Sequence, residues 1–348
     1  MVIGVILLVS SHAATPYAST ESENGSLSGV ASLQSSSAAS GGSYVTFGSA
    51  SSGPGNILGV PAGITPGAIY ENAFTSMSAS QQAAVIQQMK ADGVKWLRLD
   101  APSVFTFDTL ISDAENAGIN VDAVIQNWNT ATTPSAMGSF ATQAVNHYKP
   151  KGVETYEVLN EPNGCAEPMS ASDYTALLKS VYTAIKTADS QARVLTAGMC
   201  PAGGSNEPYT YLQAMYTAGA QGYFDAFNDH PYSAPDTPLQ TGDSWNPWSY
   251  LAQLHSIMQA NGDGNKQIWL TEFGCPTGTD GGYTAYCTDS TEATQITDAF
   301  TSARQQSWLG PLLIYDWQDD SEGDWGIYNS NGTAKASVLS AYTSAANQ

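Results

Sequence analysis

Two glutamates stand where hydrophobic runs of the chain end. Glu161 follows the stretch YEVLN at residues 156–160, and Glu272 lies within WLTEFG at residues 269–274. Hydrolysis of a glycosidic bond needs two carboxyl groups: one donates a proton to the leaving oxygen, and the other attacks or supports the anomeric carbon. When the configuration is retained, the two groups are about 5–5.5 Å apart. We therefore interpret the two glutamates as a candidate catalytic pair, provided the fold brings them together.

The elements that must position this pair alternate along the chain. Short β-rich runs separate helix-like stretches such as residues 78–93, which begin with a serine cap and end on Gly93. Eight βα units are the count of a TIM barrel, so we predict an α/β fold, a single-domain (β/α)8 barrel. A doubly wound open sheet is the alternative, but GVPAGITPG at residues 59–67 does not fit a dinucleotide fingerprint. The predicted strands are 56–61, 94–100, 119–126, 153–160, 192–198, 224–230, 267–273 and 311–317.

A barrel places its functional groups at the C-terminal ends of its strands. Those ends are unusually polar and aromatic here, whereas simple capping would favour Ser, Thr and Gly. The fourth and seventh strands face each other across an eight-stranded barrel, so Glu161 and Glu272 can converge over its mouth. The other candidate site residues at strand ends are Arg98, Asn160, His230, Tyr232 and Trp317.

Two motifs carry a resemblance to a known group of proteins. NEP at residues 160–162 and TEFG at residues 271–274 resemble the motifs of the retaining glycoside hydrolases of clan A, the four-seven superfamily. The resemblance spans roughly residues 56–345 and is nearest to the cellulase-like families 5 and 39. The third strand lacks the His-Asn pair that many family 5 enzymes carry. The resemblance implies that Glu161 is the general acid/base and Glu272 the nucleophile.

The neighbouring residues then have expected roles. We expect Arg98 and the Tyr232 hydroxyl to donate to Glu272 and to lower its pKa. Burial and the charge of Glu272 should raise the pKa of the acid. By the same resemblance, Asn160 would bond the sugar 2-hydroxyl, His230 would line the pocket and Trp317 would stack on the sugar. For Trp317, the structural alternative is a packed residue at the rim.

Four further tryptophans fall in predicted loops, where they could form sugar platforms in flanking subsites. Packing of the loops is the more common role of such aromatic residues. They are Trp128, Trp245, Trp248 and Trp325.

Charge and chain organisation narrow the class of protein. The 348 residues include 31 acidic and 11 basic side chains, which argues against nucleic acid binding, since phosphate contacts need clustered Lys and Arg. Residues 1–14 resemble a secretory signal peptide, and Ser, Ala and Gly dominate residues 15–53, which read as a flexible leader. We assign the catalytic domain to residues 54–348. We expect a secreted monomer without stable membrane association.

The chain has four cysteines, which in a secreted protein indicate two disulfides. Three connectivities are possible, and free buried thiols are the alternative. We favour Cys165–Cys200 and Cys275–Cys287, because each would fasten a loop beside one of the motifs. Their spacing and the scarcity of histidine argue against a zinc site, and we expect neither a metal nor a cofactor.

The sequence therefore predicts a secreted retaining β-glycosidase acting on a β-linked oligo- or polysaccharide. An endo-β-1,4-glucanase similar to cellulases is the first expectation. An exo-acting β-xylosidase, or a hydrolase of another matrix or capsular polysaccharide, is the alternative. A barrel that binds carbohydrate without turnover is the hypothesis from a different class; it would lack one carboxylate or its partners.

Overall fold

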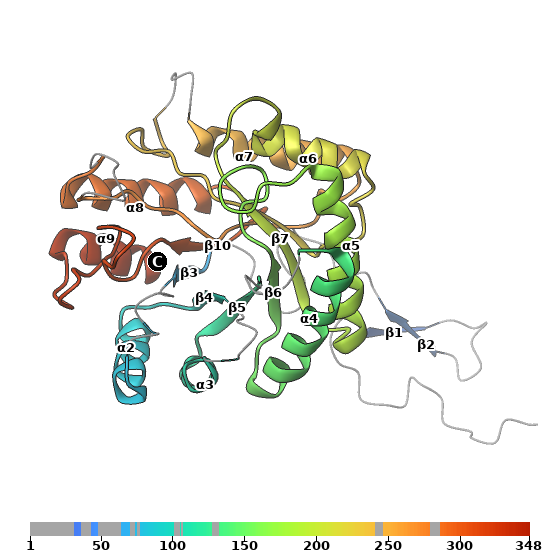
Figure 1. Ribbon diagram of the computed structural model, residues 1–348, viewed down its shortest axis with the longest axis horizontal. Helices are drawn as coiled ribbons and strands as arrows, with labels where there is room; N and C mark the ends of the chain where they lie inside the picture. Colours follow the sequence, from blue (N-terminus) through green and yellow to red (C-terminus); the bar gives the residue numbers. More distant parts are fainter. Residues whose placement is uncertain are drawn as a thin grey trace, which may run out of the picture. The chain divides into compact units, whose positions relative to one another are not determined.

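Eight parallel strands close a barrel in the described part of the chain (Figure 1). The computed structural model describes residues 31–35, 43–47, 64–69, 74, 77–100, 105, 107–126, 132–240, 246–278 and 286–348. Each barrel strand pairs with the next along the chain, and the last pairs with the first, which confirms the predicted (β/α)8 fold. The strands are β3 (Pro66–Ile69), β4 (Trp96–Asp100), β5 (Asn120–Ile125), β6 (Thr155–Val158), β7 (Arg193–Met199), β8 (Ala226–Asp229), β9 (Ile268–Leu270) and β10 (Leu309–Ile314).

Helices follow the strands and cover the outside of the barrel (Figure 1). Each helix packs one apolar stripe against the sheet. In the helix that follows β6, the Ser170 hydroxyl caps the first turn by accepting from the Asp173 amide. The helices are α2 (Ala79–Ala91), α3 (Asp108–Ala117), α4 (Pro134–Tyr148), α5 (Ala171–Ala188), α6 (Pro208–Thr217), α7 (Leu251–Ala260), α8 (Asp289–Arg304) and α9 (Ala336–Ala346).

The first barrel strand differs from the prediction. Residues 56–61 lie outside the described residues, and β3, further along the chain, fills the first position in the barrel. Its sequence PGAI contains proline and glycine, which are rare in strands, and so gives little strand signal. Gly67 is required by close packing, since a Cβ atom there would lie 2.5 Å from Leu313 Cγ and 2.9 Å from Trp96 Cβ.

The Arg193 side chain packs against two indoles inside the barrel, near the N-terminal ends of β4 and β7. The rings of Trp96 and Trp269 meet edge to face at 4.8 Å. The Arg193 guanidinium lies 5.9 Å and 5.4 Å from their centroids, and its Nη1 donates to Thr155 Oγ1 at 2.8 Å. The packed interior leaves the opposite end of the strands free for a polar site.

Two disulfides fasten loops at that end. Cys165 bonds Cys200, and Cys275 bonds Cys287, so the favoured connectivity is confirmed. The first joins the loop after β6 to the end of β7, and the second closes a loop between β9 and α8. Both hold segments that follow the strands carrying the NEP and TEFG motifs.

The N-terminal part of the chain forms a separate compact unit, residues 1–52. Within it, β1 (Ala31–Ser35) and β2 (Ser43–Phe47) pair in an antiparallel sheet, regular structure that the Ser-rich composition did not predict. The predicted signal peptide, residues 1–14, lies outside the described residues. Among the helices described, none combines the length and apolar character needed to cross a membrane.

The fold buries several carboxyl groups, and burial destabilises their ionised forms. Burial raises the pKa of Glu115 to about 7, of Asp229 to about 8 and of Glu292 to about 9. Each group therefore holds its proton in the folded chain at pH values where the unfolded chain has released it. Below the ordinary pKa near 4.5 both states hold the proton, and stability falls as the pH rises toward the folded pKa.

We predict that the protein melts at a higher temperature at pH 5 than at pH 8. The folded chain binds more protons than the unfolded chain across this interval, so raising the pH favours unfolding. Thermal unfolding followed by circular dichroism measures the effect. Glu115→Gln keeps an oxygen that can accept from the Val121 amide and should flatten the dependence between pH 5 and 7. A melting temperature that rises from pH 5 to pH 8 would contradict the prediction.

Candidate active site

The Arg98 side chain joins two buried carboxylates at the barrel mouth. Arg98 lies in β4 and is 4% exposed. Its Nη1 donates to Glu272 Oε1 at 2.8 Å, while Nε and Nη2 donate to the two oxygens of Glu157 at 2.9 and 2.8 Å. This bidentate contact fixes the guanidinium plane and thereby aims one N–H at Glu272. Nη2 also donates to Asn160 Oδ1 at 3.0 Å.

Sequence reasoning missed Glu157, which lies inside β6 and is fully buried. It is the bidentate partner of Arg98. Despite burial, which raises it, the pKa of Glu157 is lowered by the Arg98 charge and hydrogen bonds. The available signal was a charged residue among the apolar side chains of YEVLN, since a buried strand seldom carries an unpaired acid.

Glu272 follows β9 and receives both predicted donors. Besides Arg98, the Tyr232 hydroxyl donates to Glu272 Oε2 at 2.8 Å. The net pKa shift differs from the expectation, because burial raises the pKa of Glu272 above its ordinary value. His230, Arg98 and the Tyr232 hydrogen bond pull in the opposite direction and do not fully offset burial.

Glu161 follows β6 in a left-handed backbone conformation with φ of 46°. Non-glycine residues rarely adopt this conformation unless the surroundings hold it. Its amide donates to the Gly198 carbonyl at 3.1 Å, and the Cys165–Cys200 disulfide ties the following loop to β7. The backbone turn is thus held from both sides, and it directs the carboxylate to the barrel mouth.

His230 lies between the two glutamates. Its Nδ1 is 2.9 Å from Glu161 Oε1 and 3.4 Å from Glu272 Oε2. One oxygen of each glutamate and a ring nitrogen of His230 all lie within 4.8 Å of one another. Burial lowers the pKa of His230, but the nearby charges of Glu272 and Glu161 outweigh it and raise the pKa overall.

A hydrogen-bonded chain behind His230 orients the ring. His230 Nε2 lies 3.1 Å from Thr271 Oγ1, and that hydroxyl accepts from Asn228 Nδ2 at 2.6 Å. The Thr271 hydroxyl can donate its proton to Nε2, and in that tautomer the Nδ1 proton is directed at Glu161. Gly198 makes room for the ring, because a Cβ atom there would lie 1.9 Å from Nε2.

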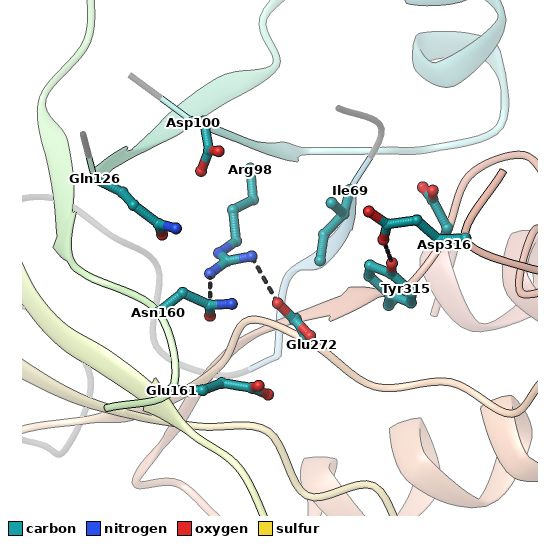
Figure 2. A pocket seen from close by; sticks show the side chains of 10 residues that line it. Ile69, Arg98, Asp100, Gln126, Asn160, Glu161, Glu272, Tyr315 and Asp316 are labelled. Carbon is teal, nitrogen blue, oxygen red and sulfur yellow. Dashed lines mark hydrogen bonds and ion pairs between the residues drawn. The ribbon is translucent and has the colours of Figure 1, made fainter. Parts of the chain in front are cut away.

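These groups open into a polar pocket of about 370 Å³ (Figure 2). Glu161 and Glu272 approach it from different strand ends, and Asp100 and Gln126 also line it (Figure 2). Burial raises the pKa of Asp100 to about 6. The lining residues are Ile69, Arg98, Asp100, Gln126, Asn160, Glu161, Glu272, Tyr315, Asp316 and Glu322.

Trp317 has a different place from the expected one. It is 2% exposed, packs on Tyr328 and Tyr342, and is not among the residues lining the pocket. The strand β10 ends at Ile314, short of the predicted end at residue 317, and Tyr315 is the aromatic residue that lines the pocket. Its hydroxyl donates to Glu322.

The loop tryptophans divide into three cases. Trp248 is buried in a short helical turn (Pro247–Tyr250), packs on Phe273 and donates to Ser302 Oγ, so it has the loop-packing role. Trp325 is half-buried and meets the rings of Tyr232 and Tyr315 edge to face, which keeps it near the pocket wall. Trp128 and Trp245 lie outside the described residues.

The cluster of Glu161, His230 and Glu272 has the spacing of a three-ligand metal site. However, the Arg98 charge lies 2.8 Å from Glu272 and opposes a second cation there. Cys165 and Cys200, which lie near Glu161, are joined to each other and offer no thiolate. The arrangement is better suited to moving protons than to holding an ion.

The barrel and its paired glutamates place the protein in the class of TIM-barrel enzymes. Its sequence matches the family described as the glycosyl hydrolase catalytic core over residues 103–342, more than half of the chain. The chain therefore belongs to this family and is a glycoside hydrolase, which supports the resemblance to the cellulase-like enzymes of clan A. No curated protein matches it in sequence.

Solved structures similar to this chain share the barrel at low identity. An endo-β-1,3-glucanase of family GH128 from Sorangium cellulosum is 20% identical with a TM-score of 0.58, covering 81% of this chain and 98% of its own. A monomeric β-xylosidase from Caulobacter crescentus is 16% identical with a TM-score of 0.58, covering 82% and 69%. A β-glucuronidase from Ruminococcus gnavus, in complex with D-glucuronic acid, is 12% identical with a TM-score of 0.59, covering 82% and 50%. These identities show the fold alone.

We predict that Thr271→Val lowers kcat/KM about 10-fold or more, because an unsatisfied buried polar group costs about 1–3 kcal/mol. The variant removes the hydroxyl that bonds His230 Nε2 and Asn228, so the proton on Nδ1 is no longer fixed and the pH–activity profile should shift. Thr271→Ser keeps the hydroxyl and should retain most activity and the original profile. Equal loss in both variants, with unchanged profiles, would show that the hydroxyl has no such role.

Proposed function

We propose that this glycoside hydrolase is a retaining β-glycosidase with Glu161 as acid/base and Glu272 as nucleophile. The observation that carries the proposal is the proximity of their carboxylate oxygens, within 4.8 Å. Retaining enzymes separate the two groups by about 5–5.5 Å, whereas inverting enzymes leave about 6.5–9.5 Å for a water molecule. This proximity favours the retaining mechanism.

In the first step, an ionised Glu272 oxygen attacks the anomeric carbon while the bond to the leaving oxygen breaks. Glu161 donates its proton to that oxygen. Arg98 and Tyr232 hold Glu272 in line and favour its ionised form. A hydrogen bond donated by His230 Nδ1 then stabilises the negative charge that develops on Glu161.

In the second step, water attacks the anomeric carbon and gives its proton to Glu161, and the bond to Glu272 breaks. The nucleophile has no charge while glycosylated, so Glu161 is a better base than it would be beside a carboxylate. Configuration at the anomeric carbon is inverted twice and therefore retained.

The proposed substrate is a neutral β-linked polysaccharide, with endo action on a β-1,4-glucan as the first candidate. The GH128 endo-β-1,3-glucanase, which this chain covers almost end to end, favours a β-1,3-glucan as a second candidate. The β-xylosidase supports an exo-acting alternative. Both glutamates and their partners are present, which argues against a barrel that only binds carbohydrate.

The protein is further proposed to act outside the cell as a monomer. Two disulfides on the face that carries the site support this, because such bonds persist in oxidising compartments. The apolar run at the start of the sequence, within residues 1–14, is the proposed export signal.

We predict that the protein releases reducing ends from soluble β-1,4- or β-1,3-glucan. Glu161→Ala should lose about 10²–10⁴-fold on the polymer. The loss should be small for bond cleavage in aryl glycosides, whose leaving group needs no proton, and azide should restore turnover. Glu272→Ala should be inactive on both, since no other group can form the glycosyl-enzyme.

Glu154→Ala is the matched control, because it removes an exposed glutamate at the start of the segment leading into β6. It should behave as wild type. Proton NMR of the first product formed reports the stereochemistry. The α-anomer appearing first, or full activity of Glu272→Ala, would refute the mechanism.

A further inference from the structure

The loop that follows β10 supplies one side of the pocket. Three of the lining residues belong to residues 315–322, namely Tyr315, Asp316 and Glu322 (Figure 2). We propose that Lys335, which is not among the lining residues, is a positioning residue that holds this side of the pocket in its binding position. This role rests on the proposed function, because the pocket is the one in which the glycoside would be cleaved.

The Lys335 side chain is buried, and its ammonium group has a full set of acceptors. Lys335 is 4% exposed and lies directly before α9. Its Nζ donates to Asp319 Oδ1 at 2.9 Å, to Thr277 Oγ1 at 2.9 Å and to the Asp324 carbonyl at 3.3 Å. Glu292 Oε2 is 3.7 Å away. An ammonium group has three N–H donors, so each has an acceptor, and a buried charge is stable only with such partners.

The acceptors of Lys335 belong to the two loops that follow β9 and β10. Thr277 lies after β9, in the loop that the second disulfide closes. Its amide and its hydroxyl both donate to the Asp324 carbonyl, at 2.9 and 3.2 Å. Since the ammonium group bonds the same hydroxyl and the same carbonyl, one buried charge joins the two loops.

The contacts of the loop after β10 continue to the pocket lining. Asp319 Oδ1, which accepts from the ammonium group, also accepts from the Gly326 amide at 2.7 Å. The adjacent Trp325 carbonyl accepts from the Asp316 amide at 3.0 Å, and the Trp325 ring meets the Tyr315 ring edge to face. A shift of this loop would therefore move two of the residues that line the pocket.

The catalytic glutamates are positioned by other contacts. Arg98, paired with Glu157, holds Glu272, and His230 contacts Glu161. Loss of the Lys335 contacts should therefore weaken sugar binding equally in the ground state and in the transition state, which raises KM and changes kcat little. A variant that is only less stable loses active enzyme, which lowers kcat and leaves KM unchanged.

The test compares two lysine substitutions on the best cleaved β-glycoside at pH 7. Lys335→Met removes the charge and should raise KM about 10-fold, with kcat within about 3-fold of wild type. Lys266→Met is the matched control, because Lys266 also pairs with an aspartate, Asp263, at 2.8 Å but lies before β9, at the opposite end of the strand. It should leave KM unchanged. An unchanged KM in Lys335→Met, or an equal rise in both variants, would overturn the inference.

Thr277 offers a milder test that keeps the ion pair of Lys335 with Asp319. Thr277→Val removes the hydroxyl that links the ammonium group to the Asp324 carbonyl and should raise KM about 3-fold. Thr277→Ser keeps the hydroxyl and should retain the KM of wild type. If Lys335→Met does not fold, this pair decides the question, and equal KM values in the two variants would count against the role of Lys335.

Hydrogen exchange and binding separate this role from the proposed reaction. Amide exchange in residues 273–277 and 316–327 should be faster in Lys335→Met than in wild type and unchanged in Lys266→Met. If wild type cleaves no glycoside, the proposed function fails, and calorimetry with β-1,4- and β-1,3-glucan oligomers replaces KM. About 10-fold weaker binding by Lys335→Met would then support the role of Lys335. Unchanged exchange in both segments would refute it.

Discussion

The contact of Arg98 with Glu157 and Glu272 is the interaction on which the site depends. Burying two carboxylates is unfavourable unless a cation and further donors accompany them, and removing Arg98 would leave both without their shared cation. Glu157 takes two N–H groups of the guanidinium and Glu272 takes a third. Glu157 therefore fixes the Arg98 guanidinium and, through it, the position of the Glu272 carboxylate.

The pocket must satisfy opposing electrostatic demands within a few ångströms. One glutamate has to be ionised and the other protonated, although Glu272 is buried. Burial raises the pKa of Glu272, while His230, Arg98 and Tyr232 oppose it, so the ionised form depends on these three side chains. His230 contacts both glutamates and is itself held from behind by Thr271, which couples the proton positions of all three groups.

Much of this arrangement follows from the sequence, because it depends on periodicity and on strand ends. The alternation of strands and helices predicted the barrel. The two motifs identified the glutamates, and the predicted strand ends identified Tyr232. Glu157 was missed since a charge inside a buried strand can be judged only when its partner, 59 residues away along the chain, is known. Trp317 was expected in the pocket, but Tyr315 lines it instead. The end of β10 sets which aromatic residue reaches the mouth, and strand ends are the least certain feature of a sequence pattern.

The space reserved at Gly198 links this position to the histidine opposite it. A Cβ atom would overlap the His230 ring, so even alanine at position 198 requires a smaller or displaced side chain at position 230. The residues at positions 198 and 230 are therefore expected to change together. Among descendants of this sequence, and in any library built from it, substitutions at position 198 are expected to survive only together with a change at position 230, and with it a different way of supporting Glu161.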